Sequence, residues 1–344
     1  MKILLIGNDF FQYRKALEDS LVHLGHSVVS YSLTDSWNST IVGKIHTKIW
    51  TFKTHLSKDE DQYYGLPENI MRDKNKEILD LYQKFNPDLF LSFAGYDLMP
   101  ELLQQIQGAK KILWIYDSIL KLKKIFPALK YYEKIYTFEK TDLSVFNMLG
   151  LNAEFLPLCA DQRVYYPIEG LYKDIDVSFV GALTETRLKL FRELHRELPL
   201  LSMAIYGKYV GRLDIIGHAC RVFHKEKKVF TNSMICPEKA NELYSRSKIC
   251  INLHRGQSQY GGNMRLYEIM SAKAFQITNK NSYIEDNFSD CLIMYSDFPD
   301  LIGKIRYYLL HEDERDDIRR RGYSKVINSE LFIHRARYIL DNLN

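Results

Sequence analysis

The sequence has few cysteines, and no pattern brings them together as a metal or redox site. Its five cysteines, among 344 residues, are scattered, and no two have the close spacing of a zinc knuckle or a CxxC motif. Cys159 and Cys250 lie in apolar runs, where buried thiols are common. We therefore expect a protein of a reducing compartment, which favours a cytoplasmic localisation.

Long apolar runs and a strong net charge are also absent. The apolar start MKILLIG is followed at once by the polar NDFFQYRK, so we expect neither a signal peptide nor a membrane span there. The formal charge is only +4 and no clustered RNA-binding motif occurs, so we expect no nucleic-acid partner. The sequence shows no solenoid repeat, and its hydrophobic content of 46% supports substantial folded cores.

Apolar runs alternate with helical segments along the first half of the chain. The pattern predicts a helix at 9–25 that ends at Gly25, and strands at 2–7, 27–33, 88–93, 111–116, 134–139 and 153–158. Near-continuous apolar strands separated by helices are typical of a parallel sheet that is covered on both faces. Residues 34–73 break this pattern, and we expect them to form a long irregular connection.

A second alternation begins after Pro167. It predicts strands at 176–181, 201–207, 248–254, 274–278 and 291–296, and helices at 185–197, 237–247, 264–272 and 298–311. Because the chain exceeds the usual size of one domain, we predict an α/β fold with two Rossmann-like domains. Their predicted extents are residues 1–158 and 159–330, and a terminal helix at 331–344 would pack back on the first domain. The two parallel sheets should face each other across a central cleft, where ligands bind outside the carboxyl ends of strands.

The segment from Lys248 to Thr278 carries the most informative motif. It predicts a strand, a polar loop with glycines, a helix and a second strand. The start of a helix presents unpaired backbone N–H groups that can bind phosphate, here those of Gly261, Gly262, Asn263 and Met264. Arg265 adds a positive charge in the first turn, where a cation is favourable only beside an anion. Glu268 follows one turn later, where a carboxylate can hold ribose hydroxyls, so the segment predicts a nucleotide-sugar site.

Each of these residues also has a purely structural interpretation. Adjacent glycines most often form a turn before a helix, and charged side chains such as Arg265 and Glu268 are most often solvated. We favour the binding interpretation because all of these residues fall in one strand, loop and helix segment.

A second group of candidates lies at or just after the ends of three predicted strands, at 176–181, 201–207 and 248–254. Gly181 would bring backbone amides close to a diphosphate, and Arg187 would bind phosphate through two hydrogen bonds. Tyr206 is a candidate for stacking on a nucleotide base, and Gly207 would let the strand end turn sharply. His254 either contacts the donor or packs as an ordinary strand-end histidine. The structural alternatives are tight packing for the glycines and an exposed helix charge for Arg187.

Three aspartates at predicted strand ends are candidates for a catalytic base. Asp9, Asp97 and Asp117 would all project toward the cleft. A transferase that inverts the sugar configuration needs a base beside the acceptor hydroxyl, and a carboxylate serves. We favour Asp117, followed by Asp97 and Asp9, although helix capping is the alternative for Asp9 and Asp117. No DxD-type pair stands where it would hold a metal ion.

Several motifs occur in a consistent order over roughly residues 153–311, namely LPLCAD, DVSFVGALTETR, AIYGKYVG, ELYSRSKICINLH, GNMRLYEIMSAKAFQIT and CLIMYS. In these motifs the chain resembles the GT-B glycosyltransferases, in particular the CgeB-like branch related to spore-maturation proteins. The resemblance implies metal-independent transfer from a UDP-, dTDP- or GDP-linked sugar, with Glu268 at the donor ribose. Many retaining relatives have a further glutamate where this chain has Tyr260, and a glycine where it has Lys273–Ala274.

The expected reaction moves a sugar to a hydroxyl of a glycan, a lipid-linked molecule or a protein. A nucleotide-sugar-binding protein without turnover is the alternative with the same fold. A Rossmann-type oxidoreductase is a weaker alternative, because GNDFFQ stands where it would need GxGxxG. Residues 118–136 mix lysines with apolar residues. They predict either a peripheral contact with the inner face of a membrane or an ordinary core segment whose lysines extend into solvent.

Overall fold

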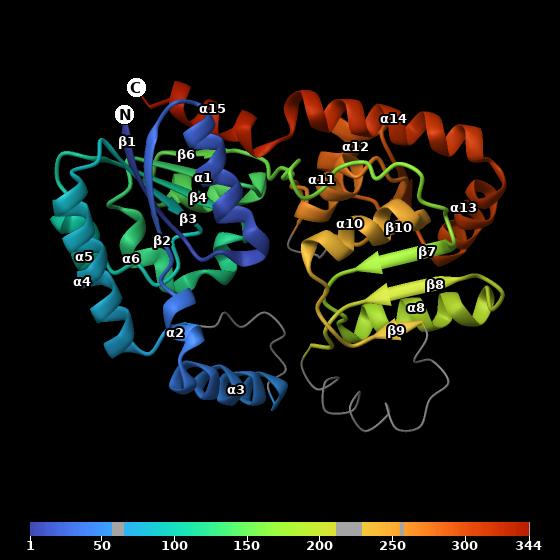
Figure 1. The fold of residues 1–344 in the computed structure, drawn as a ribbon, viewed down its shortest axis with the longest axis horizontal. Coiled ribbons are helices and arrows are strands. Elements are labelled where there is room, and N and C mark those ends of the chain that lie inside the picture. Colours follow the sequence, from blue (N-terminus) through green and yellow to red (C-terminus); the bar gives the residue numbers. More distant parts are fainter. Residues whose placement is uncertain (57–64, 211–228, 255–257, 344) are drawn as a thin grey trace.

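Two parallel six-stranded sheets form the framework of the computed structural model, which describes residues 1–56, 65–210, 229–254 and 258–343. The first sheet has the order β2-β1-β3-β4-β5-β6, formed by β1 (Lys2–Ile6), β2 (Ser27–Tyr31), β3 (Leu89–Phe93), β4 (Lys110–Ile115), β5 (Lys134–Thr137) and β6 (Ala153–Phe155). The second has the order β12-β11-β10-β7-β8-β9, formed by β7 (Ile175–Val180), β8 (Met203–Tyr206), β9 (Phe230–Thr231), β10 (Ser247–Asn252), β11 (Gln276–Asn279) and β12 (Ile293–Tyr295). Figure 1 shows the two sheets in separate lobes. The predicted α/β fold with two parallel sheets is therefore confirmed.

Helices cover the sheets of both lobes. The N-terminal lobe has α1 (Tyr13–His23), α2 (Asp35–Ser39), α3 (Ile41–Leu56), α4 (Glu68–Phe85), α5 (Pro100–Gln105), α6 (Phe126–Leu129) and α7 (Leu143–Met148). The C-terminal lobe has α8 (Glu185–Glu197), α10 (Pro237–Arg246), α11 (Met264–Ser271), α12 (Ser282–Phe288), α13 (Phe298–Leu310) and α14 (Glu312–Ser329). All five residues of β3 are buried, as a strand between two layers of helices requires. None of the described helices is long and apolar enough to cross a bilayer.

The last helix returns to the N-terminal lobe. α15 (Phe332–Asp341) packs against α1, with the rings of Tyr13 and Phe332 stacked at 6.2 Å. At the crossing, Arg335 donates hydrogen bonds to the carbonyl oxygens of Pro157 and Leu158. One hydrophobic core therefore continues from the first sheet, through α1 and α15, to α11 of the C-terminal lobe. The domain limits at residues 158 and 330 stay a prediction.

Two parts of the N-terminal lobe differ from the expectation. Most of the described part of 34–73 is helical (α2, α3 and the start of α4), so the predicted irregular connection is wrong there, while residues 57–64 lie outside the described residues. The helix expected at 9–25 begins only at Tyr13, because Phe11 and Gln12 have φ angles of 52° and 66°. Such left-handed residues cannot continue a right-handed helix.

The segment 118–136 belongs to the core of the N-terminal lobe. It forms two short 3-10 turns (Ile119–Lys121 and Lys123–Ile125), α6 and β5. Most of its apolar side chains are buried beneath the first sheet, among them Ile119, Leu122, Ile125 and Leu129. These side chains are therefore not available to a lipid surface, which favours the core interpretation of this segment, while a peripheral membrane contact through its exposed residues stays a prediction.

Candidate functional site

A cavity of about 460 Å³ lies between the two lobes. Phe11 and Asp117 of the N-terminal lobe line one side of it. The other side is formed by the ends of β7, β8 and β10 and by the start of α11. Its lining includes seven of the predicted residues, namely Asp117, Gly181, Arg187, Tyr206, Gly207, Asn263 and Arg265. The remaining candidates, Asp9, Asp97, His254, Gly261, Gly262, Met264 and Glu268, do not line it.

The loops after β7 and β8 form a wall in which backbone lies directly against backbone. The Gly181 N–H donates to the carbonyl oxygen of Tyr206 at 3.0 Å, and a Cβ at Gly207 would lie only 1.8 Å from the Gly181 carbonyl oxygen. A Cβ at Gly181 would meet the ring of Phe179 at 2.9 Å. Close approach therefore requires glycine at position 207.

Arg187 joins two of these strand-end loops. It lies in the first turn of α8, where the Thr184 side chain caps the helix by accepting from the Arg187 N–H. Its guanidinium donates to the carbonyl oxygens of Ala182, at 3.0 Å, and Leu253, at 2.6 Å. These bonds hold a permanent positive charge at the wall of the cavity.

The tip of α11 reaches the cavity through Asn263 and Arg265. The Asn263 side chain caps the helix by accepting from the Leu266 N–H at 3.0 Å, and the adjacent Asn252 donates to it at 3.1 Å. Asn263 and Arg265 are the residues of this helix start that meet the cavity. Met264 is buried in the interlobe core instead.

His254 lies behind this wall and holds the tip of α11. Its Nε2 accepts from the Asn263 N–H at 3.2 Å, and its Nδ1 lies 3.1 Å from Oγ1 of Thr278. Burial, together with the positive charge of Arg187, lowers the pKa of His254 to about 3. The structure therefore places His254 as a buried, neutral, packed histidine, which was the structural alternative.

Gly261 and Gly262 pack closely instead of facing the cavity. A Cβ on Gly261 would lie 2.4 Å from the carbonyl oxygen of Phe138, and one on Gly262 would lie 2.5 Å from the Leu266 side chain. The preceding Tyr260 accepts from the Lys140 N–H at 3.1 Å through its carbonyl oxygen. Gly261 thus lets the loop before α11 approach the N-terminal lobe, whereas Gly262 lets the loop pack closely against α11 itself.

Glu268 is engaged by a residue of the other lobe. Its Oε1 accepts a 2.5 Å hydrogen bond from the hydroxyl of Tyr13 on α1, and its Oε2 lies 3.9 Å from Nε of Arg265. Only 2% of Glu268 is exposed. Burial and the adjacent carboxylate raise the pKa of Tyr13 well above its usual value, so the phenol stays a donor. Glu268 therefore lies one step behind the cavity wall, with Arg265 between it and the cavity.

The sequence did not single out Tyr13 or Phe11. The guanidinium carbon of Arg265 lies 5.3 Å from the centre of the Phe11 ring, within the range of a cation–π interaction. Phe11 reaches this place through a left-handed backbone, a conformation that favours glycine, asparagine and aspartate over phenylalanine. No local signal in the sequence marks such a residue, since its position follows from the fold.

Of the three candidate aspartates, Asp117 is the one on the cavity wall. It accepts a 2.5 Å hydrogen bond from the hydroxyl of Tyr96. Asp97 has a φ of 59°, and its carboxylate accepts from the Leu66 N–H, so it holds a loop.

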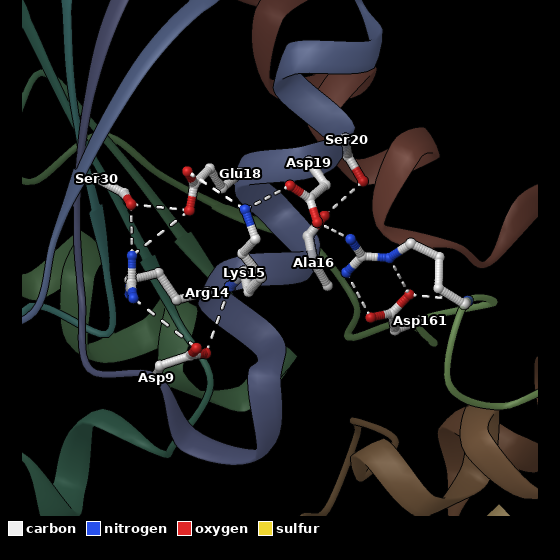
Figure 2. Close-up of polar contacts among 10 residues, drawn as sticks. Asp9, Arg14, Lys15, Ala16, Glu18, Asp19, Ser20, Ser30 and Asp161 are labelled. Atoms are coloured by element: carbon white, nitrogen blue, oxygen red, sulfur yellow. Dashed lines mark hydrogen bonds and ion pairs between the residues drawn. The ribbon is translucent and has the colours of Figure 1, made fainter. Parts of the chain in front are cut away.

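Asp9 belongs to a polar network at the start of α1. It forms an ion pair with Arg14 at 3.8 Å and accepts from the Lys15 N–H at 3.4 Å. Figure 2 shows this network, in which Arg14 also reaches Glu18 and Ser30. Asp9 therefore has structural partners at the start of α1, although the N-cap residue of this helix is Gln12. Among the described residues no group of three or more His, Cys, Asp or Glu side chains could hold a metal ion, and metal independence stays a prediction.

Comparisons with known proteins give a partial family match and a fold match. Residues 187–341, somewhat less than half of the chain, match a family model described as glycosyl transferase-like. No curated protein sequence matches the chain.

Solved structures match over almost the whole chain at low sequence identity. Sucrose-phosphate synthase from Thermosynechococcus elongatus has a TM-score of 0.67 at 11% identity, covering 99% of this chain and 98% of its own. An E. coli trehalose-6-phosphate structure bound with UDP-2-fluoro glucose has a TM-score of 0.67 at 9% identity, and the match covers 100% of this chain and 99% of the other. Anabaena HepE in complex with UDP-glucose has a TM-score of 0.64 at 10% identity, and the match again covers 100% of this chain and 99% of the other. The chain therefore has the GT-B fold of these structures, as predicted, and its residues 187–341 are similar to the glycosyl transferase-like family.

Proposed function

We propose that this protein is a glycosyltransferase of the CgeB-like branch, which moves a sugar from a nucleoside-diphosphate donor to an acceptor hydroxyl. The observation that carries the proposal is the composition of the interlobe cavity. Two arginines and the tip of α11 line its C-terminal side, and Asp117 lines its N-terminal side. Its volume of about 460 Å³ lies within the ordinary range of ligand pockets. HepE, whose structure shares this fold, was solved in complex with UDP-glucose.

On the donor side, Arg187 and Arg265 would bind the diphosphate. Both are fixed by neighbours, Arg187 by two carbonyl oxygens and Arg265 between Phe11 and Glu268. As the bond between the sugar and the diphosphate breaks, negative charge grows on the leaving group. Guanidinium groups that are already in place stabilise it without reorganising. In this proposal they do the work of a metal ion, and Tyr206 lies at the wall where a base would stack.

On the acceptor side, Asp117 would serve as the base of an inverting reaction. The acceptor oxygen forms a bond with the sugar carbon, that carbon's bond to the diphosphate breaks, and the hydroxyl proton passes to the Asp117 carboxylate. Tyr96 orients this carboxylate through its 2.5 Å hydrogen bond. The acceptor would be a glycan, a lipid-linked molecule or a protein.

Glu268 would hold the ribose of the donor, and this role requires a change from the described arrangement. Its Oε1 is occupied by Tyr13 and its side chain is buried, so the hydrogen bond with Tyr13 has to open before a ribose hydroxyl can take its place.

A ligand panel tests the donor site. We expect UDP, dTDP or GDP, and a sugar carried by one of them, to raise the melting temperature and to bind in calorimetry. Arg265→Ala should weaken that binding by about 1.5–3 kcal/mol, or roughly 10–150-fold, because it removes a charged donor. Arg196→Ala, on the exposed end of α8, is the matched control and should bind as the wild type does. Unchanged affinity in both Arg265→Ala and Arg187→Ala would refute the site.

A turnover assay separates an enzyme from a binding protein. We expect purified protein to release the nucleoside diphosphate from its preferred donor, slowly with water and faster with an acceptor. Tight donor binding without release, across a panel of glycan, lipid-linked and peptide acceptors, would instead identify a non-catalytic nucleotide-sugar-binding protein.

A further inference from the structure

Helix α3 has an apolar side that the described residues leave exposed. Ile41, Val42, Ile45 and Ile49 are each between 51% and 77% exposed. At 100° per residue these four side chains fall within one sector of the helix. Single exposed apolar residues are ordinary on protein surfaces, but a stripe of this kind on one helix is typical of a surface that binds something.

The packing of the opposite side of α3 shows which way this apolar stripe points. A Cβ on Gly43 would lie 2.0 Å from the carbonyl oxygen of Trp37, and the His46 ring lies 6.2 Å from the Trp37 ring. Gly43 and His46 therefore face α2, and the apolar stripe points away from it. Figure 1 shows α3 below α2, at the lower edge of the N-terminal lobe and outside the sheet.

The charges on α3 identify the kind of partner that fits. The helix, IVGKIHTKIWTFKTHL, contains three lysines and no acidic residue. Lys44 and Lys48 are exposed and lie beside the apolar stripe. A basic helix with an apolar side is complementary to an anionic bilayer, in which the apolar side chains enter the interface and the lysines meet the lipid phosphates. A second copy of α3 would fit less well, since it would bring lysines toward lysines.

We propose that α3 docks this protein on the surface of an anionic lipid bilayer. This contact is separate from the interlobe cavity and does not depend on the reaction that occurs there. It also differs from the membrane contact expected from 118–136, whose apolar side chains are mostly buried in the core.

Flotation with lipid vesicles tests the proposal. We expect the wild type to float with phosphatidylcholine vesicles that contain about 30% phosphatidylserine, and to stay behind with pure phosphatidylcholine or in high salt. Ile45→Ser with Ile49→Ser should abolish flotation. Lys44→Gln with Lys48→Gln should lower vesicle affinity about 25-fold, or about fivefold for each lysine.

Matched controls keep the test specific. Leu200→Ser with Leu310→Ser removes two exposed leucines of the C-terminal lobe and should leave vesicle binding unchanged. Circular dichroism and the melting temperature should show that every variant folds. Wild-type protein that never floats with anionic vesicles, or an isoleucine double variant that floats as well as the wild type, would overturn the proposal. A wild-type dimer in light scattering that the isoleucine variant converts to a monomer, without vesicle binding, would identify α3 as an interface between two copies.

Discussion

Mild acid should destabilise this protein through one buried histidine. His254 is 8% exposed, and its two ring nitrogens have different partners. Nε2 accepts from the Asn263 N–H, which leaves the ring proton on Nδ1, where it is donated to the Thr278 hydroxyl. Only the neutral ring can accept and donate in this way, because both nitrogens of an imidazolium are donors. The geometry thus agrees with the lowered pKa of about 3.

The magnitude follows from the difference between the folded and unfolded pKa. Histidine in an unfolded chain has a pKa near 6.5, whereas His254 in the folded protein has a pKa of about 3. Between these values the unfolded state binds a proton that the folded state does not, so the free energy of unfolding falls as the pH falls. The slope is about 1.4 kcal/mol per pH unit, and the expected loss between pH 7 and pH 5 is about 2 kcal/mol.

Urea unfolding of three proteins at pH 7 and pH 5 measures this contribution. His254→Gln keeps an acceptor for the Asn263 N–H but cannot titrate, so it should lose about 2 kcal/mol less than the wild type over this range. His23→Gln replaces an exposed histidine at the end of α1 and should behave as the wild type does. If His254→Gln and the wild type lose the same free energy to within about 0.5 kcal/mol, the assignment of a neutral, buried His254 is wrong.

Three further substitutions test the cavity and the contact between the lobes. Gly207→Ala should lower the free energy of unfolding by about 3 kcal/mol or more, because its Cβ would overlap a carbonyl oxygen. The control Gly303→Ala has open space around its Cβ and should change the free energy of unfolding by no more than about 1 kcal/mol. Equal effects in urea unfolding would contradict this reasoning. Tyr13→Phe should lower the free energy of unfolding by about 1–3 kcal/mol, because it leaves the buried Glu268 carboxylate without its donor. An unchanged urea midpoint would count against the hydrogen bond between Tyr13 and Glu268. Asp117→Asn should reduce kcat by about 100- to 10,000-fold with little change in donor affinity, and a fully active variant would exclude Asp117 as the base.

Local signals in the sequence predict every strand of the first sheet, five of the six strands of the second, and most helices of the C-terminal lobe, while the two-residue β9 (Phe230–Thr231) is not predicted. α8 (Glu185–Glu197) begins and ends where expected, since Thr184 caps its start and its apolar residues recur at helical spacing. α11 begins at Met264 as expected, after the capping Asn263. Apolar runs of the first sheet are equally clear, because burial on both faces leaves little room for polar residues.

Features that depend on the whole fold cannot be predicted from local sequence signals. The helices within 34–73 lack an evident pattern, because α3 carries exposed isoleucines where a soluble helix would have polar residues. Phe11 gives no sign of its left-handed backbone. Similarly, Asp9 and Asp117 both follow a strand, yet one pairs with Arg14 and the other lines the cavity. Strand order and side-chain direction decide between them, and neither is a local property.

The contact between Tyr13 and Glu268 shows what a motif can and cannot specify. The motif places Arg265 and Glu268 one turn apart on α11, but the partner of Glu268 comes from α1, 255 positions earlier in the chain. Because the two residues belong to different lobes, any motion that separates α1 from α11 breaks their hydrogen bond and exposes Glu268. The bond therefore governs both the stability of the contact between lobes and the access of a ligand to this carboxylate. Tyr13→Phe tests the two together: a loss of stability accompanied by tighter donor binding would mean that the tyrosine and the ribose compete for the same oxygen.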